Sequence, residues 1–460
     1  MHEITTRVAP SPTGLCHLGT ARTALYSYLV AKKAGSKFII RMEDTDIARS
    51  KKEYEDDILA SLEWLGIKSD VPIIRQSERA SIYKKYVQIL LDKGLAYKCY
   101  CTAEELEKKR EDQLAAKEKP LYDRTCDGMK DQPGKPFVVR FRVEDHGGVQ
   151  WRDLVLGRIN VRKAEISDFI IQRQDGSVGY LLANMIDDAL QGVTHIVRGI
   201  DGMANAPAQI MLFEALGFPV PNYAHTPFIH NEKGEKLSKR NGAASVMEYR
   251  NMGILPEAMV NALVRIGWSH GNDEIFSMED LIEKFDLNNV GKAPGSMDMN
   301  KFHHINKHWL KVADPNRLAD LIFPFLKEVG VEGRAKSKGH PFLVNAIKTL
   351  QTRAKTLKEM AEMAKFYYIS DFEMERALSE QEKKWVICAL DYINTSDFTA
   401  TGLNTATVLA MDNCGTNKAQ LLPALRMALS GKSCSPGVVE IMEVLGKEET
   451  CRRISAALVR

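Results

Sequence analysis

The chain has 460 residues, 44% of them hydrophobic and 27% charged, which is typical of globular proteins and excludes a disordered or fibrous chain. Its formal net charge of +3 is too small to demand a nucleic-acid partner, although a basic face could still bind one. The first residues lack the apolar core of a secretion signal, and no uncharged apolar run approaches the roughly 18 residues of a membrane span. The eight cysteines are scattered, which favours a reducing cytoplasm over a disulfide framework.

The N-terminal stretch predicts a phosphate-binding turn. Residues 5–9 are expected to end a strand, a turn rich in Pro, Ser, Thr and Gly follows, and apolar spacing predicts a helix over residues 20–34. Such a turn presents free backbone N–H groups and the positive end of the helix dipole to a ligand. His17 adds a side-chain donor, and Gly19 leaves room for a planar ring against the backbone. A motif this short is a weak signal by itself.

The next strand is predicted over residues 37–42, where a buried apolar run ends at an acidic tip. Strand, helix and strand form a βαβ unit, whose ligands lie at the carboxyl ends of the strands. Glu43 is therefore placed to receive a cationic group such as an α-amine, or else it is a solvated strand-end carboxylate.

Further along, the segment after Leu95 reads as a mixed α+β insert between two halves of the parallel sheet. It contains a capping box at Thr102 and Glu105 that should start a charged helix over 102–119. After Leu255 the chain is expected to be helical throughout, with bundle-core apolar spacing. The other predicted helices cover residues 51–65, 79–92, 205–216, 256–267, 278–285 and 307–312, and the other extended segments cover residues 73–74, 137–143, 154–161, 167–182 with an Asp175-Gly176 turn, 193–199 and 224–230.

A basic stretch, Lys236-Leu237-Ser238-Lys239-Arg240, follows the last predicted strand. Three cations in five residues are usually a solvated loop. The alternative interpretation is a loop that clamps a polyphosphate.

Together, P-S-P-T-G-x-x-H-x-G near the N-terminus and K-x-S-K-R downstream resemble the signature motifs of class I aminoacyl-tRNA synthetases, in the form similar to glutamyl-tRNA synthetases. The resemblance covers the whole chain, including residues 436–447, which are similar to the closing segment of bacterial members. It implies an enzyme that joins L-glutamate to tRNA-Glu, or also tRNA-Gln, through a glutamyl-adenylate, using ATP and Mg²⁺. It further implies a cytoplasmic monomer without membrane contact.

The implied fold is α/β, with a Rossmann-like parallel-sheet nucleotide-binding domain, an α+β insert and an all-α C-terminal half. Four domains are implied: residues 1–94 and 190–241 for catalysis, 95–189 as an inserted tRNA acceptor-binding domain, 242–312 as a stem-contact domain, and 313–460 as a helical anticodon-binding domain.

The resemblance also implies roles for individual residues. It places four in catalysis: His17, Gly19, Lys236 and Lys239. The implied glutamate-binding residues are Arg7, Ala9, Ser11, Glu43, Tyr180, Asn184 and Arg198. The implied ATP-binding residues are Ser11, Thr13, His17, Gly19, Thr20, Lys236, Leu237, Ser238, Lys239 and Arg240. Arginines suit a dicarboxylic amino acid, because a guanidinium binds a carboxylate through two parallel hydrogen bonds.

Cys99, Cys101 and Cys126 resemble the zinc site that some members carry in the insert. Zinc needs four ligands. Some relatives have His where this chain has Asp127, whereas Tyr122 matches another arrangement in the wider family. The alternative is a vestigial site with three reduced thiols.

One region departs from the family pattern. Arg198-Gly199-Ile200-Asp201-Gly202 stands where R-G-E-D-H is expected, and Asn205-Ala206-Pro207-Ala208-Gln209 where N-T-P-R-Q is expected. The changes at Ile200, Gly202, Ala206 and Ala208 predict altered recognition of the tRNA acceptor end.

Other readings are disfavoured. A shortened relative that glutamylates a modified tRNA base and a generic nucleotidyltransferase would both lack the helical half. A glutaminyl enzyme has a different opening motif from residues 9–13 here. An inactive synthetase-like tRNA-binding protein would be expected to lose His17 or Lys239, and both are present.

Overall fold

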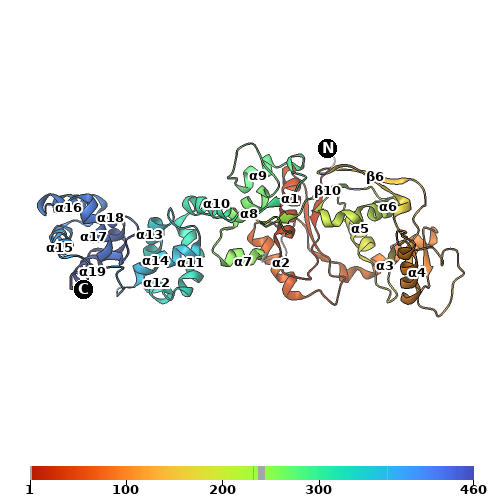
Figure 1. Cartoon of the computed structure of the whole chain (residues 1–460), viewed down its shortest axis with the longest axis horizontal. Coiled ribbons are helices and arrows are strands. Elements are labelled where there is room, and N and C mark those ends of the chain that lie inside the picture. Colours follow the sequence, from red (N-terminus) through yellow and green to blue (C-terminus); the bar gives the residue numbers. More distant parts are fainter. Residues whose placement is uncertain (1–2, 232, 237–243, 370, 460) are drawn as a thin grey trace. The chain divides into compact units, whose positions relative to one another are not determined.

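The computed structural model describes residues 3–231, 233–236, 244–369 and 371–459. It consists of two compact units (Figure 1), Met1–Glu248 with Val260–Asp298, and Tyr249–Met259 with Met299–Arg460. This division is coarser than the four predicted domains, whose boundaries stay a prediction.

The first unit is built on a five-stranded sheet whose paired strands are all parallel, which confirms the Rossmann-like fold. The order β10-β9-β1-β2-β3 joins strands from both halves of the unit's sequence. Phe38–Met42 is buried along its whole length, as expected for a parallel strand covered on both faces. The strands are β1 (Thr6–Val8), β2 (Phe38–Met42), β3 (Ile74–Arg75), β9 (His195–Gly199) and β10 (Asn222–Thr226).

Helices cover both faces of this sheet. The crossovers from β1 to β2 and from β9 to β10 run in opposite directions, so right-handed connections place α1 and α6 on opposite faces (Figure 1). The strand order therefore reverses between β1 and β9, where open α/β sheets bind ligands. The helices are α1 (Leu18–Lys33), α2 (Lys52–Trp64), α3 (Ala80–Asp92), α4 (Ala103–Ala115), α5 (Tyr180–Leu190), α6 (Ala206–Leu216) and α9 (Met278–Lys284), with α7 (Val246–Asn251) and α8 (Pro256–Arg265) at the boundary of the two units.

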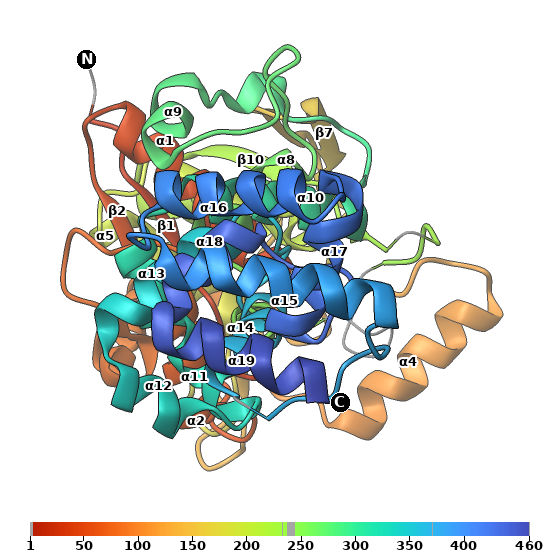
Figure 2. The ribbon, with the colours of Figure 1, turned by 90° about the vertical axis from the view of Figure 1, so that its left-hand side faces the viewer.

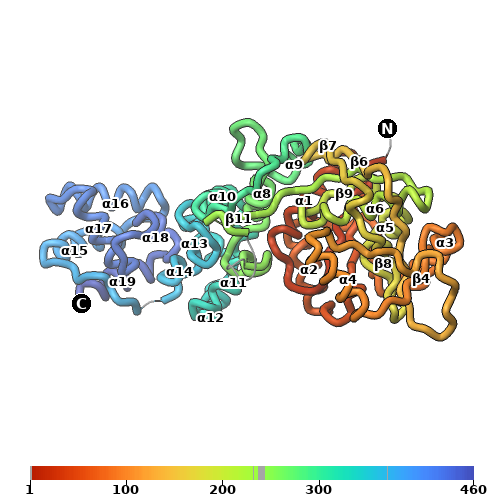
Figure 3. The backbone as a smooth tube through the Cα atoms, turned by 45° about the vertical axis from the view of Figure 1, so that its right-hand side comes forward, coloured from red at the N-terminus to blue at the C-terminus, as the bar shows by residue number. Residues whose placement is uncertain are grey.

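The insert is α+β, as predicted. Antiparallel β4 (Ala96–Cys99), β5 (Val138–Phe141) and β8 (Ile170–Gln172) form a sheet, and β4 packs against α3 (Figure 3). A separate hairpin pairs β6 (Gly148–Asp153) with β7 (Gly157–Arg162). Short β11 (Ile229–His230) pairs with β12 (Gly295–Ser296), so the expected strand 224–230 is two strands in two sheets.

Several element boundaries differ from the predictions. The first helix begins at Leu18 rather than 20, because His17 is its N-cap. The helix after Thr102 ends at Ala115 rather than 119, since Lys117 adopts a φ of 59°. Strand β6 was not predicted.

The largest error concerns α5, which begins at Tyr180 inside the segment expected to be extended. Its Leu-Leu-Ala run fits a strand and a helix equally well. Helix α10 likewise begins at Met299 rather than 307.

The second unit is helical, which confirms the predicted all-α half. Figure 2 shows α15, α16 and α19 toward the viewer. Amphipathic spacing and side-chain caps define these helices; Ser379, for example, forms a capping box with Glu382. They are α10 (Met299–Val312), α11 (Pro315–Glu328), α12 (Glu332–Lys338), α13 (His340–Leu350), α14 (Leu357–Tyr368), α15 (Glu380–Thr395), α16 (Ala400–Asn413), α17 (Lys418–Ser430), α18 (Val438–Leu445) and α19 (Lys447–Val459).

One cysteine pair differs from the expectation of scattered thiols. Cys388 in α15 and Cys414 at the end of α16 form a disulfide, because the packed helices bring the two positions together. None of the helices that the structure describes is long and apolar enough to cross a membrane.

Candidate active site

A pocket of about 620 Å³ lies at the carboxyl ends of the parallel strands, around the point where the strand order reverses. It brings together residues that the sequence spreads from the N-terminus to the basic stretch. The predicted residues that line it are Arg7, Ala9, Ser11, Thr13, His17, Gly19, Thr20, Tyr180, Asn184, Arg198 and Lys236. Glu43 is not part of this lining but bonds to Asn184, which is. Leu237, Ser238, Lys239 and Arg240 lie outside the described residues.

One end of the pocket is the N-terminus of α1. His17 caps this helix, and its Nδ1 accepts a hydrogen bond from the Thr20 N–H at 3.2 Å. A Cβ on Gly19 would lie 3.0 Å from that same nitrogen, so the planar ring against the glycine is that of His17 itself. The backbone N–H groups of the first helical turn have no partner within the helix, which makes this end favourable for an anion.

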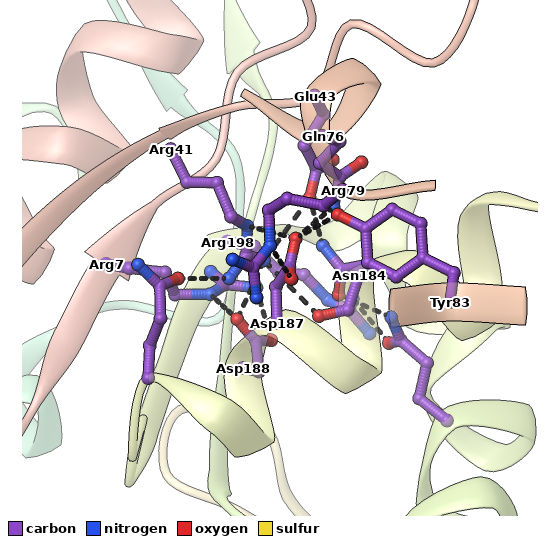
Figure 4. Close-up of polar contacts among 12 residues, drawn as sticks. Arg7, Arg41, Glu43, Gln76, Arg79, Tyr83, Asn184, Asp187, Asp188 and Arg198 are labelled. Atoms are coloured by element: carbon purple, nitrogen blue, oxygen red, sulfur yellow. Dashed lines mark hydrogen bonds and ion pairs between the residues drawn. The ribbon is translucent and has the colours of Figure 1, made fainter. Parts of the chain in front are cut away.

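The other end is a buried network of charged side chains (Figure 4). Arg7 on β1 donates to Asp188 through Nε at 3.0 Å and Nη2 at 3.2 Å. Arg41 on β2 lies 2.8 Å from the same carboxylate. Burial alone would raise the pKa of Asp188, but the guanidiniums of Arg41 and Arg7 outweigh it and hold that pKa below its usual value. Asp188 is therefore a carboxylate that fixes both arginines.

Asp187, next to Asp188 on α5, is another buried carboxylate of this network. It accepts from Arg79 at 2.8 Å, from Gln76 at 3.1 Å and from the Tyr83 hydroxyl at 2.7 Å. Its carboxylate is fully buried, so these donors replace the water that it loses.

Glu43 extends the network toward the pocket. It accepts a hydrogen bond from the Asn184 amide, and Arg41 lies 3.4 Å away. Burial raises the pKa of Glu43, although the nearby guanidiniums of Arg41 and Arg7 oppose this. Asn184 in turn accepts from Gln209 at 2.7 Å. Burial also raises the pKa of Tyr180, which lines the pocket, to about 12, so its hydroxyl stays a donor.

Arg198 differs from the other arginines of this region. Its Nε donates to His225 Nε2 at 3.0 Å and its Nη1 to Gln209 Oε1 at 2.8 Å, both neutral acceptors. Within the described part of the chain, its buried Nη2 has no hydrogen-bond partner and its guanidinium pairs with no carboxylate. Burial without such a partner lowers the pKa of Arg198. A ligand carboxylate is the chemistry that this atom lacks.

Lys236, the first residue of the basic stretch, lines the pocket. It bridges to His230, and its Nζ lies 3.8 Å from the centre of the Phe228 ring. Its side chain thereby lines the same pocket as His17. The structure thus joins one cation of the basic stretch to the helix N-terminus.

The three predicted metal-binding cysteines do come together in the insert. The sulfurs of Cys99, Cys101 and Cys126 lie within 4.8 Å of one another. The Tyr122 hydroxyl is 3.3 Å from Cys99 Sγ and 3.6 Å from Cys101 Sγ. Asp127 instead pairs with Arg142, so Tyr122 is the fourth residue of the cluster. These spacings fit a tetrahedral zinc site, whose sulfurs would be about 3.8 Å apart at a Zn–S distance of about 2.3 Å.

Sequence reasoning missed several residues that hold this site. Asp188, Gln209 and His225 all contact predicted ligand-binding side chains. The signal available was weak: an Asp-Asp pair after the segment expected to be extended, and a histidine in an apolar strand. Their partners lie too far along the chain for spacing to reveal them.

Two of the four unusual residues are buried, and their predicted effect on recognition of the tRNA acceptor end stays a prediction. Ala206 and Ala208 are buried at the start of α6, with 0% and 6% exposure, and Ala206 belongs to the core cluster. Ile200 and Gly202 are partly exposed.

Comparison with known proteins matches this arrangement over the whole chain. The family model for "tRNA synthetases class I (E and Q), catalytic domain" matches residues 3–304, and the "Anticodon binding domain" model matches residues 317–458. The chain is 47% identical to the glutamate–tRNA ligase of Geotalea uraniireducens over 465 residues, which cover 100% of this chain and 99% of that protein. It is also 47% identical to the glutamate–tRNA ligase of Geobacter sulfurreducens over 472 residues, again covering 100% and 99%.

Solved structures agree. A glutamate–tRNA ligase from Elizabethkingia meningosepticum, in complex with its amino acid, superposes with a TM-score of 0.88 at 29% identity and covers 100% of this chain and 99% of its own. The glutamate–tRNA synthetase of Elizabethkingia anophelis gives a TM-score of 0.84 at 30% identity, with 100% of both chains covered.

Proposed function

We propose how the pocket serves the reaction of the class I glutamate–tRNA ligase family, to which this chain belongs. The chain is a ligase that attaches L-glutamate to tRNA at the expense of ATP. The observation that carries the residue assignment is Arg198, a partly buried residue that lines the pocket and whose buried Nη2 is unpaired among the described residues.

Arg198 is assigned to the side-chain carboxylate of glutamate, because no carboxylate of the described chain neutralises it. Arg7 presents its remaining N–H groups to the other carboxylate, since Asp188 occupies its Nε and Nη2. Glu43, or the backbone beside Ser11, receives the amine. The other glutamate contacts are Ala9, Tyr180 and Asn184, all of which line the pocket.

The ATP phosphates are assigned to the N-terminus of α1 with His17, Gly19 and Thr20, and to the turn at Ser11 and Thr13. Lys236, which lines the same pocket, is assigned to the phosphates as well. The ATP-binding role of Leu237, Ser238, Lys239 and Arg240 rests on the motif alone.

The substrate carboxylate itself attacks the α-phosphate, so the protein supplies no nucleophile. Its contribution is positioning and stabilisation of the charge that develops on pyrophosphate. Mg²⁺, which prefers phosphate oxygens and water, would neutralise part of this charge.

Zinc is proposed in the insert, held by Cys99, Cys101, Cys126 and Tyr122. The sulfur spacing and the hydroxyl near two of the sulfurs support this donor set. Its contribution would be structural, because these residues belong to the insert sheet and its following loop. Metal analysis of the purified protein should find one zinc, and Cys101→Ser should lose it while Cys434→Ser, an exposed cysteine, should not. Equal metal content in both variants would refute the site.

The enzyme is proposed to charge tRNA-Gln at least as well as tRNA-Glu. It is also proposed to act as a monomer. The support is Ile200 and Gly202, which replace polar residues of the family pattern beside Arg198. The helical unit would read the anticodon, whose unstacked bases are accessible to side chains. Aminoacylation of both purified transcripts tests the proposal. A preference for tRNA-Glu above about a hundredfold, or ~2.7 kcal/mol, would refute it.

The assignment as a whole is tested by ATP–pyrophosphate exchange with glutamate, with and without tRNA. Glutamate-dependent exchange that Arg198→Ala impairs is expected. If neither condition gave exchange or aminoacylation, the chain would be a tRNA-binding protein without activity, contrary to its full-length relatives.

A further inference from the structure

The side chains that accept hydrogen bonds from Arg198 determine where the remaining N–H groups of its guanidinium point. Arg198 on β9 and His225 on β10 are register partners on neighbouring parallel strands. Arg198 Nε donates to His225 Nε2 at 3.0 Å. Since a guanidinium has only donors, Nε2 must carry a lone pair and the imidazole proton must sit on Nδ1.

That proton faces Asp153, the last residue of β6. His225 Nδ1 lies 2.6 Å from Asp153 Oδ2, and both side chains are fully buried. Asp153 is itself held, because it accepts from the backbone N–H groups of Val155 and Leu156 at 3.0 and 2.9 Å. The carboxylate therefore fixes the tautomer of His225, and the tautomer provides the acceptor for Arg198.

We infer that His225 and Asp153 are positioning residues, which hold Arg198 through a neutral acceptor so that its unpaired Nη2 meets the side-chain carboxylate of glutamate. The inference rests on the role proposed above for Arg198. It assigns the pair to substrate recognition, in addition to any part in strand packing.

The side chains that hold Arg198 are neutral, and this affects the choice between glutamate and glutamine. Arg7 is bound by the carboxylate of Asp188, so its charge is largely compensated by the protein. Among the described residues, the hydrogen-bond acceptors of Arg198 are an imidazole and the amide of Gln209, and both are neutral. Its full positive charge remains for the ligand, and this favours a carboxylate over the neutral amide of glutamine.

Gly202 makes room for this arrangement. A Cβ at this position would lie 2.7 Å from Nε and 2.8 Å from Cδ of Arg198. These atoms are in the middle of the side chain, so it could not remain on its present course to His225. Gly202 is not among the glycines with positive φ, and its backbone therefore tolerates alanine.

The same geometry predicts an acid limit to glutamate binding. His225 is surrounded by Asp153, Arg198 and Arg7, and its ring stacks on Tyr223 at 5.8 Å. Burial lowers its pKa, which the hydrogen bond to Asp153 opposes. Protonation at low pH would remove the acceptor on Nε2 and set a cation against Arg198. Because the pKa of His225 is lowered, the KM for glutamate should rise only at a pH well below the ordinary histidine pKa of about 6.5.

Two substitutions separate the two bonds of His225. His225→Asn can keep a donor toward Asp153 but has no atom at the Nε2 position. His225→Gln can place its carbonyl oxygen near Nε2 but gives up the Asp153 contact. His195→Asn, on the opposite end of β9, is the matched control for loss of a partly buried histidine.

Aminoacylation by the full chain should be measured at saturating tRNA, together with a thermal melt of each variant. We expect His225→Asn and Gly202→Ala to raise the KM for glutamate about tenfold or more, the scale of one hydrogen bond to a charged group, with little change in the KM for ATP. His225→Gln should be milder, and both His225 variants should lose the rise in KM at low pH. His195→Asn should resemble the wild type.

The outcomes distinguish the possible failures. If Arg198→Ala raised the KM for glutamate but His225→Asn did not, the positioning inference would be wrong while the proposed role of Arg198 stood. If Arg198→Ala itself left that KM unchanged, the proposed glutamate site would fail. A purely structural role would instead make His225→Gln the worse variant, with a lower melting temperature and parallel changes in both KM values.

Discussion

Replacing Asp188 with asparagine should destabilise the first unit, because it removes a carboxylate that compensates two buried guanidiniums. Arg7 Nε lies 3.0 Å and Arg41 Nη2 2.8 Å from this carboxylate, and the three side chains are at most 4% exposed. Asparagine has nearly the same size and keeps one acceptor oxygen. The effect therefore reports the lost charge and not a cavity.

The magnitude follows from what each arginine retains. Removing one partner of a buried ion pair costs about 3–5 kcal/mol. Arg41 keeps Glu43 at 3.4 Å and Asp187 at 3.9 Å, whereas among the described residues Arg7 forms an ion pair with Asp188 only. We expect the lower end, about 3 kcal/mol, which corresponds to a melting temperature lower by about 6–12 °C.

The stabilising contribution of the Asp188 carboxylate should depend on pH. Burial would raise the pKa of Asp188, but Arg41 and Arg7 hold it below its ordinary value. A carboxylate whose folded pKa is lowered contributes stability above its unfolded pKa of about 3.9, and this contribution is lost as the pH falls through the folded pKa. The difference between variant and wild type should be full at pH 7 and shrink below about pH 4.

Thermal unfolding of the full chain at several pH values measures this difference. Asp92→Asn, at an exposed position on α3, is the control and should change the melting temperature little. An Asp188→Asn protein that melts with the wild type at pH 7 would show that the network does not depend on this charge, and would refute the reasoning.

Three further substitutions test the ATP side of the pocket. Lys239→Ala, predicted from the motif alone, should lower kcat by about a hundredfold, or ~3 kcal/mol, with glutamate binding retained; near-normal turnover would mean a merely solvated loop. Lys236→Ala, whose side chain lines the pocket, should act in the same direction, and a selective rise in the KM for glutamate would contradict its place opposite the phosphates. Gly19→Ala brings a Cβ to 3.0 Å from the His17 ring and should raise the KM for ATP without changing that for glutamate, which an unchanged ATP dependence would disprove.

Local sequence patterns were sufficient to predict most elements of the sheet. The apolar run at Phe38–Met42 and the capping box at Thr102 each depend on residues a few positions apart, and both predictions are confirmed. The start of helix α5, residues 180–182, was assigned to an extended segment, because Leu181 and Leu182 suit either structure and the deciding contacts are tertiary.

The candidate site likewise contains some residues that local sequence patterns predict and others that only tertiary contacts reveal. Motif spacing was sufficient to select Arg7, His17 and Arg198, which line one pocket. It could not reveal Asp188, 181 residues from Arg7, or His225, whose function depends on the register of two strands. Bonds between such distant residues are determined by the fold and leave no local pattern.

The most direct test of the central claim is a crystal structure of the protein with L-glutamate bound. The account predicts the side-chain carboxylate within about 3.2 Å of Arg198 Nη2, with the amine toward Glu43 and the second carboxylate toward Arg7. Glutamate bound elsewhere, or bound here with Nη2 still lacking a partner, would contradict it.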